Sequence, residues 1–148
     1  MLRRVTSGLV ALLGWVAACA HAPASNAAGE GAVPPPLVQG TFEDDYGSRY
    51  EITPRQWAHL PAARYAIEAW FPDERYLLAR NDPDNPSDGG LWTRIDWIVL
   101  EDGGDWTWAF CMSAYDAPTR QAAAAAHADP SRPKSGCNGF PFSRMKRR

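Results

Sequence analysis

The alternation of apolar and polar residues predicts two β-hairpins in the middle of the chain. Between residues 64 and 71 every second side chain is apolar, which is the period expected when one face of a strand is buried. Pro72-Asp73-Glu74 then supplies a turn, and residues 75–80 return as a second strand.

The second predicted hairpin is the more regular one. Residues 91–100 alternate between two faces, and Asp102-Gly-Gly-Asp105 reverses the chain. The returning strand is expected to place Trp106, Trp108, Phe110 and Met112 on one face. Three tryptophans that share faces with other apolar residues are therefore expected in the core: Trp97, Trp106 and Trp108.

Shorter elements complete the predicted fold. A hairpin is expected from residues 40–46 and 49–53, and an extended piece from residues 137–143. Residues 118–128 favour a short helix, with Asp116 as a possible cap and five consecutive alanines that could lie close against a sheet. The sequence thus predicts a mainly β fold, a small antiparallel barrel or curved sheet of six to seven strands with one short helix in its C-terminal half.

The chain of 148 residues is long enough for one modest domain after an export segment is removed. Residues 1–18 have two early arginines and an apolar run typical of a signal peptide. Residues 19–36 are rich in Ala, Pro, Gly and Ser, which predicts a flexible tether. A single β-rich domain is expected from residues 37–143, followed by a basic tail over residues 144–148.

The end of the apolar run, Val16-Ala17-Ala18-Cys19, resembles the lipobox of bacterial lipoproteins. The resemblance implies cleavage before Cys19, acylation of that residue and attachment to the membrane through lipid. Ala20 follows the cysteine where the family's inner-membrane sorting signal has Asp, which implies an outer-membrane location in the cell envelope, facing the periplasm or the cell surface. The alternative is ordinary signal cleavage after Ala20, which would release a soluble protein.

The domain also shows two fainter resemblances. Gly40-Thr-Phe is similar to the Gly-x-Trp start of lipocalin-like barrels. The segments Tyr-Glu-Ile-Thr, Trp-Thr-Arg-Ile-Asp-Trp and Gly-Cys-Asn-Gly-Phe-Pro-Phe resemble uncharacterised small bacterial lipoproteins, to which no activity is attached.

The charge is small overall but unevenly distributed. The formal net charge of −2 argues against a nucleic-acid partner. All 17 acidic residues precede Ser131, whereas six of the 15 basic residues follow it. The basic tail is therefore expected either to fold back on the acidic domain or to touch anionic lipid or cell-wall polymer.

With Cys19 committed to lipid, Cys111 and Cys137 form an even pair in an oxidising compartment, which predicts a disulfide. The alternative, a catalytic thiol at Cys111, would need His59 or His127 beside it.

A candidate ligand face lies on the central strands. Trp70 and Trp92 are predicted on the same strand faces as charged residues, where an indole could stack on a sugar ring or another flat ligand. Arg94 and Asp96 lie two residues apart and so point to one face, either as a buried structural ion pair or as part of ligand recognition.

The loop of residues 81–90 offers a weak metal candidate. Asp82, Asp84 and Asp88 could meet a calcium ion, but the spacing departs from the usual calcium loop, and turn chemistry alone explains the composition. The sequence has no His-rich metal spacing, phosphate loop or Gly-x-Ser-x-Gly elbow, so no cofactor is predicted.

These features favour a lipid-anchored envelope protein with a non-catalytic binding domain for an unknown envelope ligand or protein. One alternative is a small cell-wall hydrolase that uses Asp96 with a loop carboxylate. Another is an inhibitor of a secreted enzyme, since small barrels with exposed loops suit that role.

Overall fold

A computed structural model describes residues 32–148 of the chain. The predicted signal peptide and the lipobox with Cys19 lie outside the described residues. Among the described residues, no helix is long and apolar enough to cross a membrane.

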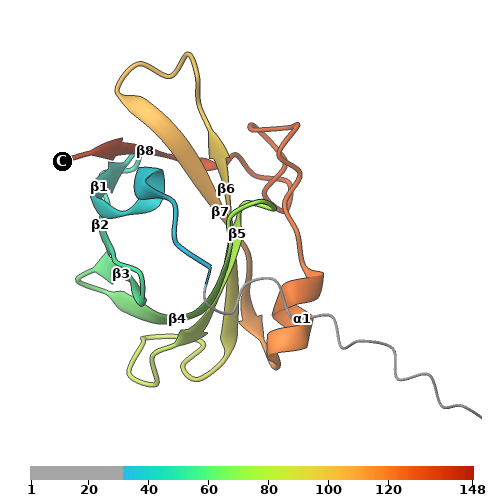
Figure 1. Cartoon of the computed structure of the whole chain (residues 1–148). Helices are drawn as coiled ribbons and strands as arrows, with labels where there is room; N and C mark the ends of the chain where they lie inside the picture. The colour runs from blue at the N-terminus through green and yellow to red at the C-terminus, as the bar shows by residue number, and fades with distance from the viewer. Residues whose placement is uncertain (1–31) are drawn as a thin grey trace, which may run out of the picture.

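The domain is a closed antiparallel barrel in which each strand pairs with its neighbours in chain order and β8 closes the circle against β1 (Figure 1). Of the two predicted architectures, a barrel and a curved sheet, the barrel is the one found, although six to seven strands was too few. The eight strands are β1 (Gly40–Asp44), β2 (Arg49–Ile52), β3 (Gln56–Leu60), β4 (Ala63–Phe71), β5 (Tyr76–Asn81), β6 (Trp92–Val99), β7 (Trp106–Ala117) and β8 (Ser143–Arg147).

Two of these strands were not predicted. Strand β3 has its buried Trp57 next to a buried Ala58, so it lacks the strict alternation of apolar and polar residues by which a half-buried strand is predicted. Strand β8 was expected to be a basic tail, and this expectation was wrong. Its Met145 is fully buried, and its backbone pairs with both β1 and β7.

Three basic residues in or just after β8 pair with acidic residues on or next to β1. Arg144 contacts Asp45 at 2.9 Å, and Lys146 contacts Glu43 at 3.2 Å. Arg148 also reaches Glu43, at 2.9 Å. Of the two roles considered for the basic end, folding back on the acidic domain is the one that these contacts support.

Aromatic side chains fill the barrel. An eight-stranded barrel has an interior just wide enough to be packed by side chains. Here Phe42, Trp57 and Trp108 are fully buried, and their rings meet edge to face at 5.1 Å for Phe42 with Trp108 and 6.1 Å for Trp57 with Trp108. The buried core comprises Val38, Phe42, Tyr50, Ile52, Trp57, Trp70, Leu77, Ala79, Ile95, Trp97, Trp108, Phe110 and Met145.

The end of the barrel where β1 begins is closed by a short 3-10 helix, η1 (Pro36–Val38). Val38 is fully buried, and Ala32 packs against the same core. Arg147 donates from Nη2 to the carbonyl of Pro36 at 3.3 Å and lies over the Phe42 ring. The predicted tether therefore does not extend to residue 36, because its last residues pack on the barrel.

Two irregularities in strand pairing reverse the predicted direction of side chains. A register shift between Ile67 and Ala69 inserts Glu68 as an extra residue, so that Trp70 points into the barrel. A second shift, between Trp106 and Trp108, leaves Trp106 outside. The prediction of core tryptophans is thus correct for Trp97 and Trp108 and wrong for Trp106, whose ring lies under the cations of β8.

The one α-helix of the described chain, α1 (Arg120–Ala125), is shorter than predicted. Its N-cap is Thr119, whose hydroxyl accepts from the backbone of Ala122 at 3.1 Å, and not Asp116. The helix lies on the outer face of the barrel over β5, β6 and β7 (Figure 1). Ala123 is fully buried there against Leu78, which confirms that the alanine run allows close packing on the sheet.

The predicted disulfide is present. Cys111 on β7 is bonded to Cys137 in the segment before β8, with their Cα atoms 5.5 Å apart. The segment that contains Cys137 was expected to be extended, but it forms turns, with an isolated bridge between Cys137 and Phe140. Gly139 has a φ of 92° in this turn, a conformation that favours glycine.

Candidate functional site

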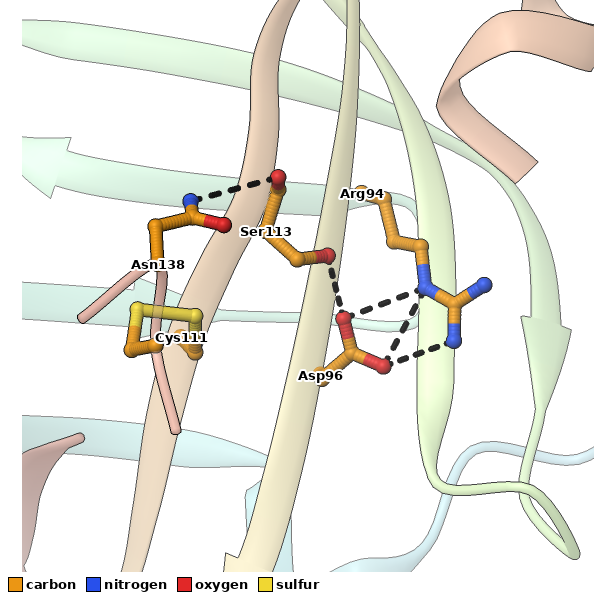
Figure 2. Close-up of a disulfide and its surroundings, with 6 residues drawn as sticks. Arg94, Asp96, Cys111, Ser113 and Asn138 are labelled. Atoms are coloured by element: carbon orange, nitrogen blue, oxygen red, sulfur yellow. Dashed lines mark hydrogen bonds and ion pairs between the residues drawn. A yellow bond between two sulfur atoms is a disulfide. The ribbon is translucent and has the colours of Figure 1, made fainter. Parts of the chain in front are cut away.

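Arg94 and Asp96 form a buried ion pair on the outer face of β6. Their side chains are only 10% and 11% exposed. Arg94 donates from Nε to both Asp96 oxygens at 3.1 Å and from Nη2 to Oδ1 at 2.7 Å, as Figure 2 shows. The structural reading of this pair is therefore the one that the geometry favours.

Neighbouring groups complete the pair. Ser113 on β7 donates its hydroxyl to Oδ2 of Asp96, and the Arg94 guanidinium lies 3.7 Å from the centre of the Tyr76 ring. Arg94 also donates from Nη1 to the carbonyl of Ala124 at 2.8 Å, near the end of α1. The pair therefore holds the helix against the sheet, and both carboxylate oxygens of Asp96 are engaged.

A cleft of about 280 Å³ lies beside this ion pair. The exposed acids Asp73 and Glu74 of the β4–β5 turn line it together with Asp96. Ile98, Pro130 and Phe142 contribute apolar surface. A carboxylate of the kind that the hydrolase alternative requires is thus near Asp96, but the Asp96 carboxylate is already paired.

The two tryptophans of the predicted ligand face do not join this cleft. Trp70 is inside the barrel, 4% exposed, and donates its indole N–H to the carbonyl of Pro54 at 2.8 Å. Trp92 is half-buried and packs against the apolar residues under α1, with the Arg80 guanidinium 5.3 Å from its ring centre. A shared ligand face of Trp70, Trp92, Arg94 and Asp96 is therefore wrong, because the β-bulge at Glu68 turns Trp70 inward and α1 covers the ion pair.

The opposite end of the barrel from η1 holds a second cavity, of about 320 Å³. We call it the barrel mouth; it lies where β3, β5 and β7 end and where the β5–β6 loop folds inward. The mouths of β-barrels are common ligand sites. Its lining residues are His59, Ala62, Ala63, Tyr65, Asn81, Asn85, Pro86, Ser87, Asp88, Met112 and Tyr115.

Two asparagines hold the walls of the barrel mouth in place. Asn81 is almost fully buried and donates from Nδ2 to the carbonyls of Asp88 at 2.9 Å and Tyr115 at 2.7 Å. Asn85 accepts from the backbone N–H of Arg64 and donates to its carbonyl, both at 2.8 Å. These bonds tie the β5–β6 loop to β4 and β7, so the cavity is preformed.

Four polar side chains in the barrel mouth have no hydrogen-bond partner among residues 32–148: His59, Tyr65, Ser87 and Asp88. The His59 ring stacks on Tyr50, with centroids 4.8 Å apart, which orients the imidazole. Tyr50 in turn donates its hydroxyl to Asp44 at 2.9 Å. The mouth therefore presents free donors and acceptors on a fixed scaffold.

Burial raises the pKa of the Tyr65 phenol, and the nearby charge of Asp88 raises it further. Tyr65 consequently remains a neutral O–H donor at and well above neutral pH. Burial, followed by the charge of Asp44, likewise raises the pKa of Tyr50. Tyr65 and Tyr50 are thus hydrogen-bond donors and not anions.

The calcium candidate is not supported. Within residues 32–148 no three His, Cys, Asp or Glu side chains come together as metal ligands. Asp82 instead accepts from the backbone N–H of Asp84 at 2.9 Å, as a turn residue does. Asp88, the third member, lines the barrel mouth.

Sequence reasoning named His59 only as a possible partner of a catalytic thiol at Cys111, which the disulfide excludes, and did not identify Tyr65 as a site residue. A weak signal was available, because each lies two residues from an inward-pointing apolar residue on its strand, Trp57 and Ile67 respectively. A polar group at an inward position near a strand end must meet either a partner or a cavity. Comparisons of this chain with known protein families, with characterised proteins and with solved structures find no match.

Proposed function

We propose that the chain is a lipid-anchored protein of the bacterial cell envelope whose barrel binds a polar envelope ligand without catalysing a reaction. The lipobox-like segment that ends at Cys19 supports the anchor. The observation that carries the binding function is the barrel mouth, a preformed cavity of about 320 Å³ with four polar side chains that lack partners within the described chain. Such a combination is what small-ligand sites share.

The hydrolase alternative is less well supported. It requires Asp96 to exchange a proton or to attack a substrate, but both of its oxygens accept hydrogen bonds from Arg94 or Ser113. Asp96 also has only 11% of its side chain exposed. Its carboxylate is therefore committed to holding α1 on the barrel.

Inhibition of a secreted enzyme is a second candidate, favoured by Phe140. Its side chain is 71% exposed at the tip of the turn that the disulfide holds. The backbone of Phe140 exchanges two hydrogen bonds with Cys137, at 2.8 and 3.0 Å. A rigid, protruding aromatic side chain is a suitable anchor for a pocket on a partner protein.

Fractionation tests the anchor. Cys19→Ser should move the protein from the membrane pellet to the soluble envelope fraction and should abolish labelling by a radioactive fatty acid. An unlabelled wild-type protein whose fractionation does not change in the variant would contradict the lipoprotein proposal.

Purified cell-wall sacculi test binding against catalysis. The full mature chain, isolated in detergent, should co-sediment with sacculi, and no soluble sugar or peptide fragments should accumulate in the supernatant. Release of fragments that stops in Asp96→Asn would favour the hydrolase. Loss of co-sedimentation in Phe140→Ala alone would mean that the exposed turn, and not the barrel mouth, contacts the sacculus.

A further inference from the structure

We propose that the barrel mouth binds a small, neutral, hydroxylated ring, the chemistry of a single sugar unit, with Tyr65 and Asp88 as its main hydrogen-bonding groups. This inference rests on the proposed binding function and names its ligand class.

The size of the barrel mouth limits the ligand. Its volume of about 320 Å³ is at the lower end of the range of about 300 to 1,000 Å³ that is usual for ligand cavities. The packed tryptophans Trp57 and Trp108 fill the barrel, so a long acyl chain could not extend inward. The cavity therefore suits one ring, or one end of a longer glycan that continues into solvent.

The polar groups match hydroxyls. Tyr65 offers an O–H donor, Asp88 offers carboxylate acceptors, and the Ser87 hydroxyl can do both. The His59 imidazole adds ring nitrogens that can take part in hydrogen bonds. Neighbouring hydroxyls on a sugar each donate and accept, so a mixed set of this kind can satisfy them. An anionic ligand is disfavoured, because the one formal charge lining the cavity is that of Asp88.

Apolar surface is available for the C–H face of a ring. Tyr115, which is 52% exposed, and the half-buried Met112 line the cavity on the β7 side. Ala62 and Ala63 line it on the opposite side, in and just after the β3–β4 turn. Aromatic and small apolar side chains around a few placed polar groups are the usual composition of small-ligand sites.

The site needs little rearrangement to bind. Asn81 and Asn85 act as positioning residues, since their hydrogen bonds hold Asp88, Tyr115 and the β5–β6 loop in place. A preformed cavity avoids the free-energy cost of ordering a loop on binding. Weak affinity for one sugar ring is therefore expected to be measurable.

Titration with free sugars tests the inference. The full mature chain in detergent is titrated with N-acetylglucosamine, its β-1,4-linked dimer and glucose, and binding is followed by saturation-transfer NMR. We expect at least one sugar to bind. Tyr65→Phe and Asp88→Asn should each raise the Kd for that sugar by roughly fivefold or more, because each variant loses one hydrogen bond to it.

Matched controls are available elsewhere on the chain. Tyr46→Phe removes the hydroxyl of a tyrosine that is 72% exposed in the β1–β2 turn, and Asp102→Asn neutralises an exposed acid in the β6–β7 turn. Both should leave the Kd unchanged. Thermal unfolding of all four variants shows whether any loss of binding is a loss of folding. A variant that does not fold is replaced by Ser87→Ala, which is expected to weaken sugar binding to the same extent.

Three outcomes would overturn the inference. The first is that none of the three sugars binds. The second is that a sugar binds but that Tyr65→Phe and Asp88→Asn leave its Kd unchanged. The third is that tetramethylammonium binds where the sugars do not, and that Asp88→Asn abolishes its binding. If sacculi still co-sediment in any of these cases, the binding function stands and only the ligand class is wrong. If nothing co-sediments, the proposed function fails as well.

Discussion

At the scale of single residues, Arg94 and Asp96 act as one unit with Ser113 and the end of α1. The guanidinium uses three of its nitrogens, two toward Asp96 and one toward Ala124. A buried charge without its partner is costly, because the desolvation penalty remains after the attraction is lost. Removal of either charge should therefore weaken the whole domain.

We expect Arg94→Ala and Asp96→Ala each to lower the free energy of unfolding by roughly 3 to 5 kcal/mol. The double variant should lose much less than the sum of the two, because it leaves no charge stranded. Urea denaturation of the three variants measures these values. The matched control is the exposed pair of Arg132 and Asp129, 66% and 37% exposed, where Arg132→Ala should cost about 0 to 1 kcal/mol. If either Arg94→Ala or Asp96→Ala lowers the free energy of unfolding by no more than this control does, the pair has no structural role.

At the scale of elements, two features decide which side chains face the core: β-bulges and barrel closure. The extra residue Glu68 reverses the direction of Trp70 relative to strict alternation. Barrel closure likewise makes a basic segment into strand β8. Its one inward apolar residue, Met145, is buried in the core, and its outward basic residues pair with acids on or next to β1. A strand with a single inward apolar residue gains most of its stability from neighbours on both sides.

Removal of residues 143–148 should therefore unfold the domain, because it leaves β1 and β7 as unpaired edges and exposes the core around Met145. Circular dichroism and gel filtration of the truncated chain measure this effect. Removal of Arg148 alone, which lies beyond β8, is the control and should be tolerated. A truncated chain that melts like the wild type would restore the interpretation of this segment as a tail.

At the scale of the whole molecule, the disulfide connects the longest strand to the segment that leads into the closing strand. It spans 26 residues, and a closed loop of that length is worth about 3.5 kcal/mol in the chain-entropy account. The same bond holds the turn that exposes Phe140. Next to the disulfide, Asn138 donates from Nδ2 to the carbonyl of Ser113 on β7 at 3.4 Å (Figure 2).

Cys137→Ala should lower the melting temperature by several degrees, since the loss of about 3.5 kcal/mol is large for a domain of this size. Thermal unfolding monitored by tryptophan fluorescence measures the shift. In the denatured, unreduced wild-type protein, thiol labelling should find no free thiol at Cys111 or Cys137. Two labelled thiols, or an unchanged melting temperature in the variant, would contradict a stabilising disulfide.

The sequence by itself determined the fold class, all six strands that it predicted up to residue 112, the disulfide and the alternation on β6. It could do so because these features depend on local period, turn residues and cysteine number. For residues 106–112 the strand was predicted correctly, but the bulge at its start was not, so Trp106 lies on the outer face and not in the core.

Only the tertiary structure decided what happens to Trp70, to β8 and to the candidate site. A bulge changes the face of every later residue on its strand, and no local pattern announces Glu68 as the extra one. The barrel mouth brings together His59, Tyr65 and Asp88 from two strands and a loop, through pairings that depend on closure of the sheet. Cavities of this kind arise from contacts distant in sequence, so a reading of local periodicity places each residue on a strand or loop without showing that they meet.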